Sequence, residues 1–124
     1  MSTFDSRALD ALAFLYLTFA HSTDGVLAPE EMRTLADKLR PWSPDEDLAA
    51  IGERLKRAVG EYKSLAASAR LERAEQSLDL VTAQTDASER VTILADLRSI
   101  AAADGQVSGE EQAFMARVAD RFGL

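Results

Sequence analysis

The stretch Ala8-Leu-Asp-Ala-Leu-Ala-Phe-Leu-Tyr-Leu-Thr-Phe-Ala20 decides the fold, because it is apolar except at Asp10 and Thr18. Those two residues are eight positions apart, so at about 100° per residue both lie on one narrow stripe of a helix. The rest of the circumference is apolar, which predicts a helix over about residues 5–22 that is packed on several sides. The expected core residues of this helix are Leu9, Leu12, Leu15, Tyr16 and Phe19.

The same stretch does not fit a secretory signal or a membrane span. Asp5 cancels the charge of Arg7 ahead of it, Asp10 interrupts it, and no small-residue cleavage site follows. It is also shorter than the roughly 20 residues that a spanning helix needs. We therefore expect a cytoplasmic protein without membrane insertion.

Apolar residues recur at helical spacing along the rest of the chain. Further helices are expected over about 29–39, from Ser43 onward with Gly60 as a kink or an end, over 65–82, from 86 to 103, and from 108 to 122. Three of these starts have the spacing of a capping box, at Ser43 and Glu46, at Asp86 and Glu89, and at Ser108 and Glu111. No strand-like alternation accompanies them, so the sequence predicts an all-α protein, a compact bundle of six to seven helices.

The composition restricts the function. The chain of 124 residues has 21 acidic and 14 basic residues, a net charge of −7, which argues against a nucleic-acid-binding module. It has no cysteine and a single histidine, His21, which excludes disulfides, thiolate nucleophiles and the usual zinc sites. We therefore expect a protein that is not an enzyme.

Basic residues gather in the middle of the chain, but glutamates lie between them. This pattern favours a solvated, ion-paired helix surface over a phosphate-binding patch. The basic residues concerned are Arg54, Lys56, Arg57, Lys63, Arg70 and Arg73.

An internal repeat relates the two ends of the chain. A shift of 80 places Asp24–Glu31 over Asp104–Glu111, and both segments read D-G-x-Φ-x-x-E-E, where Φ is aliphatic. Each follows a long apolar helix and precedes a short amphipathic one. The sequence thus predicts a single domain over residues 1–124. It would be built from helix–loop–helix units at about 5–42 and 86–124, with pseudo-twofold packing and a link of helices at 43–85.

The repeated segment has the spacing of the second half of an EF-hand calcium loop. Counted in this way, Asp24 and Asp104 are at position 5, and Glu31 and Glu111 at position 12. The acidic residues of the first half are missing, so neither loop alone is a complete site, and a cation requires carboxylates shared between segments. The candidate metal ligands are Asp24, Glu31, Asp104 and Glu111, with Glu30, Glu110 and Asp96 as further candidates. Without sulfur ligands, the cation would be hard, Ca²⁺ or Mg²⁺.

The repeated segments also have an interpretation without a metal. Asp-Gly is a common turn, and Ser108 with Glu111 is already explained as a cap. Glutamates in the first turn of a helix oppose its dipole favourably.

The segment Ile100-Ala-Ala-Ala-Asp-Gly-Gln-Val-Ser-Gly-Glu-Glu resembles the signature of the TerB-like family, A-A-x-D-G-x-Φ-x-x-x-E. The segment from Ala20 to Glu31 is a looser copy, with His21 and Thr23 in place of small residues. The resemblance covers nearly the whole chain and implies a compact all-helical duplication. It further implies divalent-metal binding by acidic residues, carried over to Asp24, Glu31, Asp104 and Glu111. It implies a signalling or scaffolding role in bacterial stress-response or tellurite-resistance systems.

Three hypotheses follow. The first is a non-enzymatic acidic module that binds a divalent cation and a protein partner. The second is a metal-free helical interaction domain whose acidic loops are only turns and caps. The third, ranked last, is a metal-assisted hydrolase, which needs carboxylates converging in an open cleft.

Overall fold

The computed structural model describes residues 5–20, 29–103 and 109–124, with the backbone alone at Ala103, Glu110 and Glu111. The described residues form six α-helices and one 3₁₀ turn and contain no strand, which confirms the all-α fold. The elements in chain order are α1 (Ser6–Phe19), α2 (Pro29–Leu39), η1 (Arg40–Trp42), α3 (Leu48–Ser64), α4 (Ala67–Ala83), α5 (Ala87–Ala103) and α6 (Gly109–Phe122).

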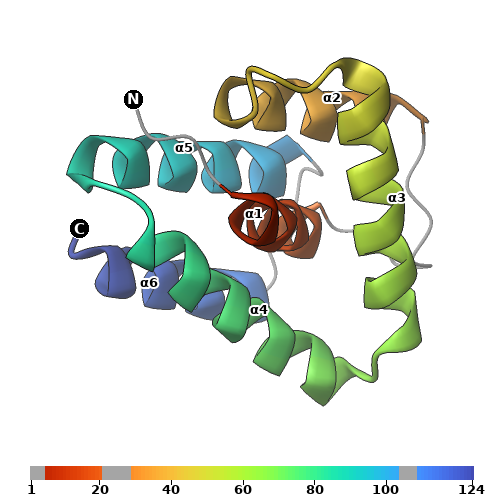
Figure 1. The fold of residues 1–124 in the computed structure, drawn as a ribbon. Helices are drawn as coiled ribbons and strands as arrows, with labels where there is room; N and C mark the ends of the chain where they lie inside the picture. The colour runs from red at the N-terminus through yellow and green to blue at the C-terminus, as the bar shows by residue number, and fades with distance from the viewer. Residues whose placement is uncertain (1–4, 21–28, 104–108) are drawn as a thin grey trace.

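Helix α1 is the central element of the fold, and it contacts α2, α3, α4 and α5 (Figure 1). Every residue from Ala8 to Phe19 is buried except Asp10 and Thr18, as the single polar stripe predicts. The five expected core residues of this helix are all buried. Because complete burial of one large apolar side chain stabilises a fold by about 1.5–3 kcal/mol, α1 contributes a large share of the hydrophobic core.

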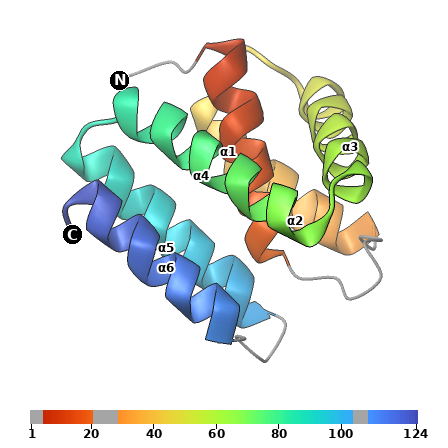
Figure 2. The ribbon, with the colours of Figure 1, turned by 90° about the horizontal axis from the view of Figure 1, so that it is seen from below.

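Helix α6 lies beside α5 on one side of the molecule (Figure 2). Helix α4 contacts both α6 and α1. Phe114 of α6 stacks on Phe19 of α1, with ring centroids 5.6 Å apart. The outer edge of α6 forms ion pairs with α4, between Arg117 and Glu75 and between Arg121 and Asp79. These ion pairs are solvent-exposed, so the apolar packing of α6 stabilises its position more than its charges do.

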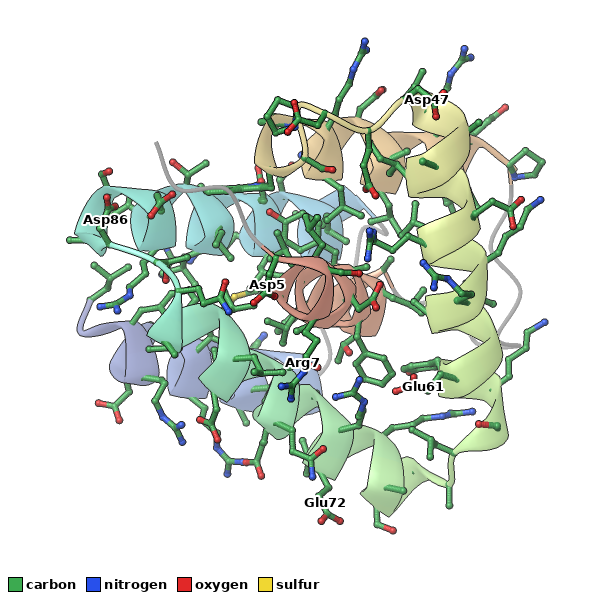
Figure 3. The ribbon with its side chains drawn as sticks, viewed as in Figure 1. Asp5, Arg7, Asp47, Glu61, Glu72 and Asp86 are labelled. Carbon is green, nitrogen blue, oxygen red and sulfur yellow. The ribbon has the colours of Figure 1, made fainter. Side chains whose placement is uncertain are left out.

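Aspartates cap three of the helices, at Asp5, Asp47 and Asp86 (Figure 3). The predicted capping box of α5 is confirmed, since Asp86 accepts from the Glu89 N–H at 2.9 Å and Glu89 accepts from the Asp86 N–H at 2.9 Å. The bond from the Glu89 N–H lowers the pKa of Asp86, and a bond from the Ala8 N–H lowers the pKa of Asp5 in the same way. The start of α5 thus follows directly from local sequence.

The predicted start of the third helix at Ser43 is wrong, because α3 begins at Leu48 with Asp47 as its cap. The Ser43 N–H donates to the Arg40 carbonyl at 3.1 Å and closes η1, so it is not free for Glu46. Helix α3 continues through Gly60 to Ser64, so the glycine does not end it. Helix α1 is also shorter than expected, since it ends at Phe19 with Ala20 as its C-cap. Among the described helices, none is both long and apolar enough to cross a membrane.

Candidate functional site

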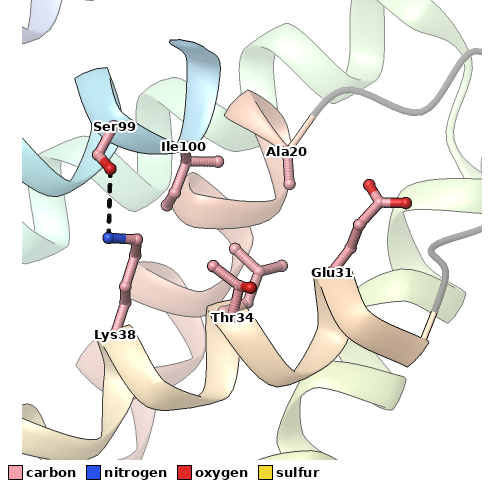
Figure 4. Close-up of a pocket in the computed structure, with 7 residues that line it drawn as sticks. Ala20, Glu31, Thr34, Lys38, Ser99 and Ile100 are labelled. Carbon is pink, nitrogen blue, oxygen red and sulfur yellow. Dashed lines mark hydrogen bonds between the residues drawn. The ribbon is translucent and has the colours of Figure 1, made fainter. Parts of the chain in front are cut away.

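A pocket of about 160 Å³ opens where α1 ends, between α2 and α5 (Figure 4). Its position is notable because the last turn of α1 and the first turn of α2 flank residues 21–28, and α5 leads into residues 104–108. The elements next to both repeated acidic segments therefore meet at one place. The lining residues are Ala20, Glu31, Thr34, Leu35, Lys38, Ser99 and Ile100.

Helix α2 forms one wall of this pocket. Glu31, Thr34 and Lys38 lie on one face because they are three and four residues apart. Figure 4 shows Glu31 and Lys38 at opposite ends of this wall, with the Glu31 side chain extending away from α2 and Lys38 reaching Ser99. Glu31 lies in the first turn of α2, where the helix dipole favours a negative charge, and Lys38 in its last turn. The pocket thus has a carboxylate at one end and an ammonium group at the other.

A partly buried polar network includes Lys38 and Ser99 of the pocket wall. The hydroxyl of Tyr16 donates to Asp96 Oδ2 at 2.7 Å, and Lys38 Nζ lies 3.9 Å from Asp96 Oδ1 and 3.5 Å from Ser99 Oγ. Tyr16 is fully buried. Its burial, followed by the negative charge of Asp96, raises the pKa of its hydroxyl well above the usual value, so Tyr16 remains a hydrogen-bond donor. The network joins α1, α2 and α5 around the pocket.

The predicted metal ligands are distributed unevenly over the described residues. Asp24 and Asp104 lie outside them, and so do the side chains of Glu110 and Glu111 in the first turn of α6. Glu31 lines the pocket and Glu30 is exposed beside it. Asp96 is bound by Tyr16 and Lys38. Within residues 5–20, 29–103 and 109–124, no three carboxylates or imidazoles gather closely enough to hold a metal ion.

Local sequence patterns did not identify the Tyr16–Asp96 pair. One signal for it was present, because Tyr16 and Asp96 are separated by the same 80 residues that relate the two acidic segments. Ala20 and Ile100, which line the same pocket, are also 80 apart. One pair of residues related by the 80-residue shift is thus hydrogen-bonded, and another lines the same pocket.

A second polar cluster is centred on Arg54 of α3. Its Nη1 donates to Asp10 Oδ1 at 2.5 Å and to the Ser6 carbonyl at 3.1 Å, and its Nη2 donates to Glu46 Oε2 at 2.7 Å. The bonds from Arg54, and then one from Ser43, lower the pKa of Glu46. The Arg54 side chain is only 7% exposed, so its expected place on a solvated surface is wrong, although its ion pairing is right. The cluster fastens the start of α1 to α3.

The family model described as "Tellurite resistance protein TerB" matches residues 9–124. No curated protein and no solved structure matches the chain.

Proposed function

Because the chain belongs to the TerB family, we propose that it is a non-enzymatic acidic module that binds a divalent cation, Ca²⁺ or Mg²⁺, and a protein partner. We assign it to the cytoplasm and to a bacterial stress-response or tellurite-resistance system. The observation that carries the metal proposal is the shared pocket, because residues flanking both acidic segments line it.

The distances along the chain support a common site. Asp24 is four residues beyond Ala20, and Asp104 is four residues beyond Ile100. Four residues of extended chain span at most about 14 Å, so both aspartates are tethered to the same pocket. Glu31 is already at its rim (Figure 4). We propose that carboxylates of the two segments complete one coordination shell that neither segment supplies alone.

The chemistry of the donors favours a hard cation. Carboxylate, carbonyl and water oxygens are the ligands that Ca²⁺ and Mg²⁺ prefer, and Ca²⁺ takes six to eight of them. We assign Asp24, Glu31, Asp104 and Glu111 as the ligands, with Glu30 and Glu110 as neighbours. Asp96, a further candidate ligand, accepts from Tyr16 and pairs with Lys38, and we propose for it a role in joining α1, α2 and α5.

The same contacts support the duplication that the sequence predicts. Under the 80-residue shift, Tyr16 corresponds to Asp96 and Ala20 corresponds to Ile100; the first pair is hydrogen-bonded and the second lines one pocket. Equivalent residues meet in this way when two units pack about an axis that passes between them. We therefore propose units at about 5–42 and 86–124 that face each other across α1 and α5.

One observation favours the metal-free interaction domain as a second candidate. In this chain the Asp86 and Glu89 spacing acts as a capping box with both hydrogen bonds formed. Ser108 and Glu111 have the same spacing, and a capping role would direct the Glu111 carboxylate to the backbone.

Titration of the ¹⁵N-labelled full chain with Ca²⁺ and with Mg²⁺ separates the two candidates. Metal binding predicts saturable amide shifts confined to residues 21–31 and 104–111. Glu31→Gln should weaken them, whereas Glu30→Gln, an equal change of charge one residue away, should have less effect. The proposal fails if millimolar metal causes no shift at these residues, or if both variants respond equally.

A further inference from the structure

A second cavity, of about 210 Å³, lies among α1, α3 and α4. It borders the first and middle turns of α1, whereas the pocket described above opens at the end of that helix. Figure 3 shows Glu61 pointing from α3 into the region between α3 and α4. In a chain of net charge −7, this cavity is lined by three arginines and only two carboxylates. It is lined by Asp10, Phe14, Arg54, Arg57, Ala58, Glu61 and Arg73.

The arginines around this cavity differ in how their donors are used. Arg54 is buried and its guanidinium is bound by Asp10 and Glu46. Arg73 donates through Nε to Glu61 at 2.5 Å. Arg57 lies 4.0 Å from Asp10, whose Oδ1 is already in contact with Arg54. Arg57 therefore shares the Asp10 carboxylate with Arg54 at the limit of ion-pair distance, and its side chain is 67% exposed.

Phe14 is the aromatic residue of the cavity wall, and Tyr62 and Arg70 lie next to the wall rather than in it. Phe14 lies 5.9 Å from Tyr62 between ring centroids, and the Arg73 guanidinium lies 5.6 Å from the Phe14 centroid. Arg70 sits 4.3 Å over the Tyr62 ring and donates through Nε to the Tyr62 carbonyl at 2.8 Å. Guanidiniums stacked on rings are held in place, which lowers the entropy lost when they bind an anion.

We propose that this cavity binds a small phosphate-class oxyanion, either free phosphate or a phosphate monoester, between Arg57 and Arg73. A guanidinium offers two parallel N–H donors to such an oxyanion, and a dianion can accept from two guanidiniums at once. A ligand with a single carboxylate would offer the arginines only the kind of acceptor that Asp10 and Glu61 already provide. The cavity volume of 210 Å³ is several times the roughly 30 Å³ that one water occupies and below the 300 Å³ or more typical of drug-sized ligands. The site uses none of the residues assigned to the cation.

The proposal is tested by titrating the full chain with potassium phosphate at constant ionic strength, with chelator present so that no metal contributes. We expect saturable amide shifts around residues 54–61 and 70–73, with a dissociation constant near or below about 1 mM. Arg57→Gln should weaken binding about tenfold, the effect of losing one charge-assisted hydrogen bond. A parallel titration with phenyl phosphate identifies the source, because tighter binding than phosphate indicates a monoester and equal binding indicates free phosphate.

Lys56→Gln is the matched control. Lys56 precedes Arg57 in α3, its side chain is 71% exposed, and it pairs with Glu53 on the helix surface. The Lys56→Gln substitution removes the same charge as Arg57→Gln but changes no residue that lines the cavity. Because salt screens the exposed charge, we expect phosphate binding to stay within about twofold of the parent. The proposal is overturned if phosphate causes no saturable shift, or if Lys56→Gln weakens binding as much as Arg57→Gln. Both positions are exposed, so melting curves should show that both variants fold.

Discussion

Replacement of Arg54 by alanine tests the buried cluster between α1 and α3 most directly. The change removes hydrogen bonds to Asp10 at 2.5 Å, to Glu46 at 2.7 Å and to the Ser6 carbonyl at 3.1 Å. A hydrogen bond to a charged group contributes about 1.5–3 kcal/mol. Adding these contributions overstates the loss of stability, because the Asp10 and Glu46 side chains are 43% and 28% exposed. Once Arg54 is removed, both carboxylates can be hydrated by solvent. We expect Arg54→Ala to lower the free energy of unfolding by about 2–3 kcal/mol.

Chemical denaturation and thermal melting measure this effect. For a domain of this size, about 1 kcal/mol corresponds to roughly 4 °C in Tm, so we expect a fall of about 8–12 °C. Arg57→Ala is the control, because Arg57 lies in the same helix, is 67% exposed and is 4.0 Å from the same Asp10. It should cost no more than about 0.5 kcal/mol. Equal decreases in the free energy of unfolding for the two variants would show that the buried hydrogen bonds of Arg54 do not stabilise the fold.

Arg54→Met separates the charge of the arginine from its packing. Methionine fills much of the space of the arginine stem but forms none of its hydrogen bonds. A buried ion pair can often be replaced by apolar residues at no cost, provided that no charge is left buried without a partner. Because Asp10 and Glu46 keep their charges, we expect Arg54→Met to recover only part of the loss. A methionine variant as stable as the parent protein would show that the ion pairs add nothing to stability.

Three other predictions concern single contacts. Tyr16→Phe should lower the free energy of unfolding by about 1.5 kcal/mol in urea denaturation, since it removes the donor to Asp96; no change would mean that the buried hydroxyl does not stabilise the α1–α5 pair. The pKa of Glu46 is lowered in the folded protein, so its ion pair adds stability above its unfolded value of about 4.3, and this stability is lost as the pH falls through the folded value. The parent should therefore melt at a higher Tm than Glu46→Gln at pH 7, and this difference in Tm should disappear below about pH 4. A difference that does not change with pH would show that the ion pair of Glu46 does not cause it. Asp47→Ala should cost about 1 kcal/mol in chemical denaturation, whereas Asp47→Asn, which keeps a cap acceptor for the Ala50 N–H, should cost much less.

The central helix could be predicted from sequence because its evidence is local. From Ala8 to the end of α1, only Asp10 and Thr18 break the apolar surface, and both are partly exposed in the structure. The start of α5 could be predicted for the same reason, since the side chains of Asp86 and Glu89 each accept from the other's backbone N–H, three residues away. The sequence repeat also indicated the region of the pocket, because the repeated segments adjoin the helix ends that line it.

The start of α3 was predicted wrongly because two nearby segments offer a cap, and the structure uses Asp47 rather than Ser43. The spacing of Ser43 and Glu46 matches a capping box, but Arg54 binds the Glu46 carboxylate from eight residues further along. Whether Arg54 is buried depends on how α1 packs on α3, which no local pattern contains. The coordination by Asp24 and Asp104 remains a prediction for the same reason, since it depends on how two segments 80 residues apart approach each other.

The central position of α1 has a consequence for the order of synthesis. The ribosome makes α1 before every helix that covers it, and α5 is complete only at Ala103. At about 5–20 residues per second, the ribosome needs roughly 4–17 seconds to translate the chain from the end of α1 to the end of α5. Throughout that interval a helix that is apolar on nearly all sides has no complete set of partners. The emerging chain is therefore a natural client for chaperones that bind hydrophobic segments, and its yield in cells should depend on translation speed as well as on stability.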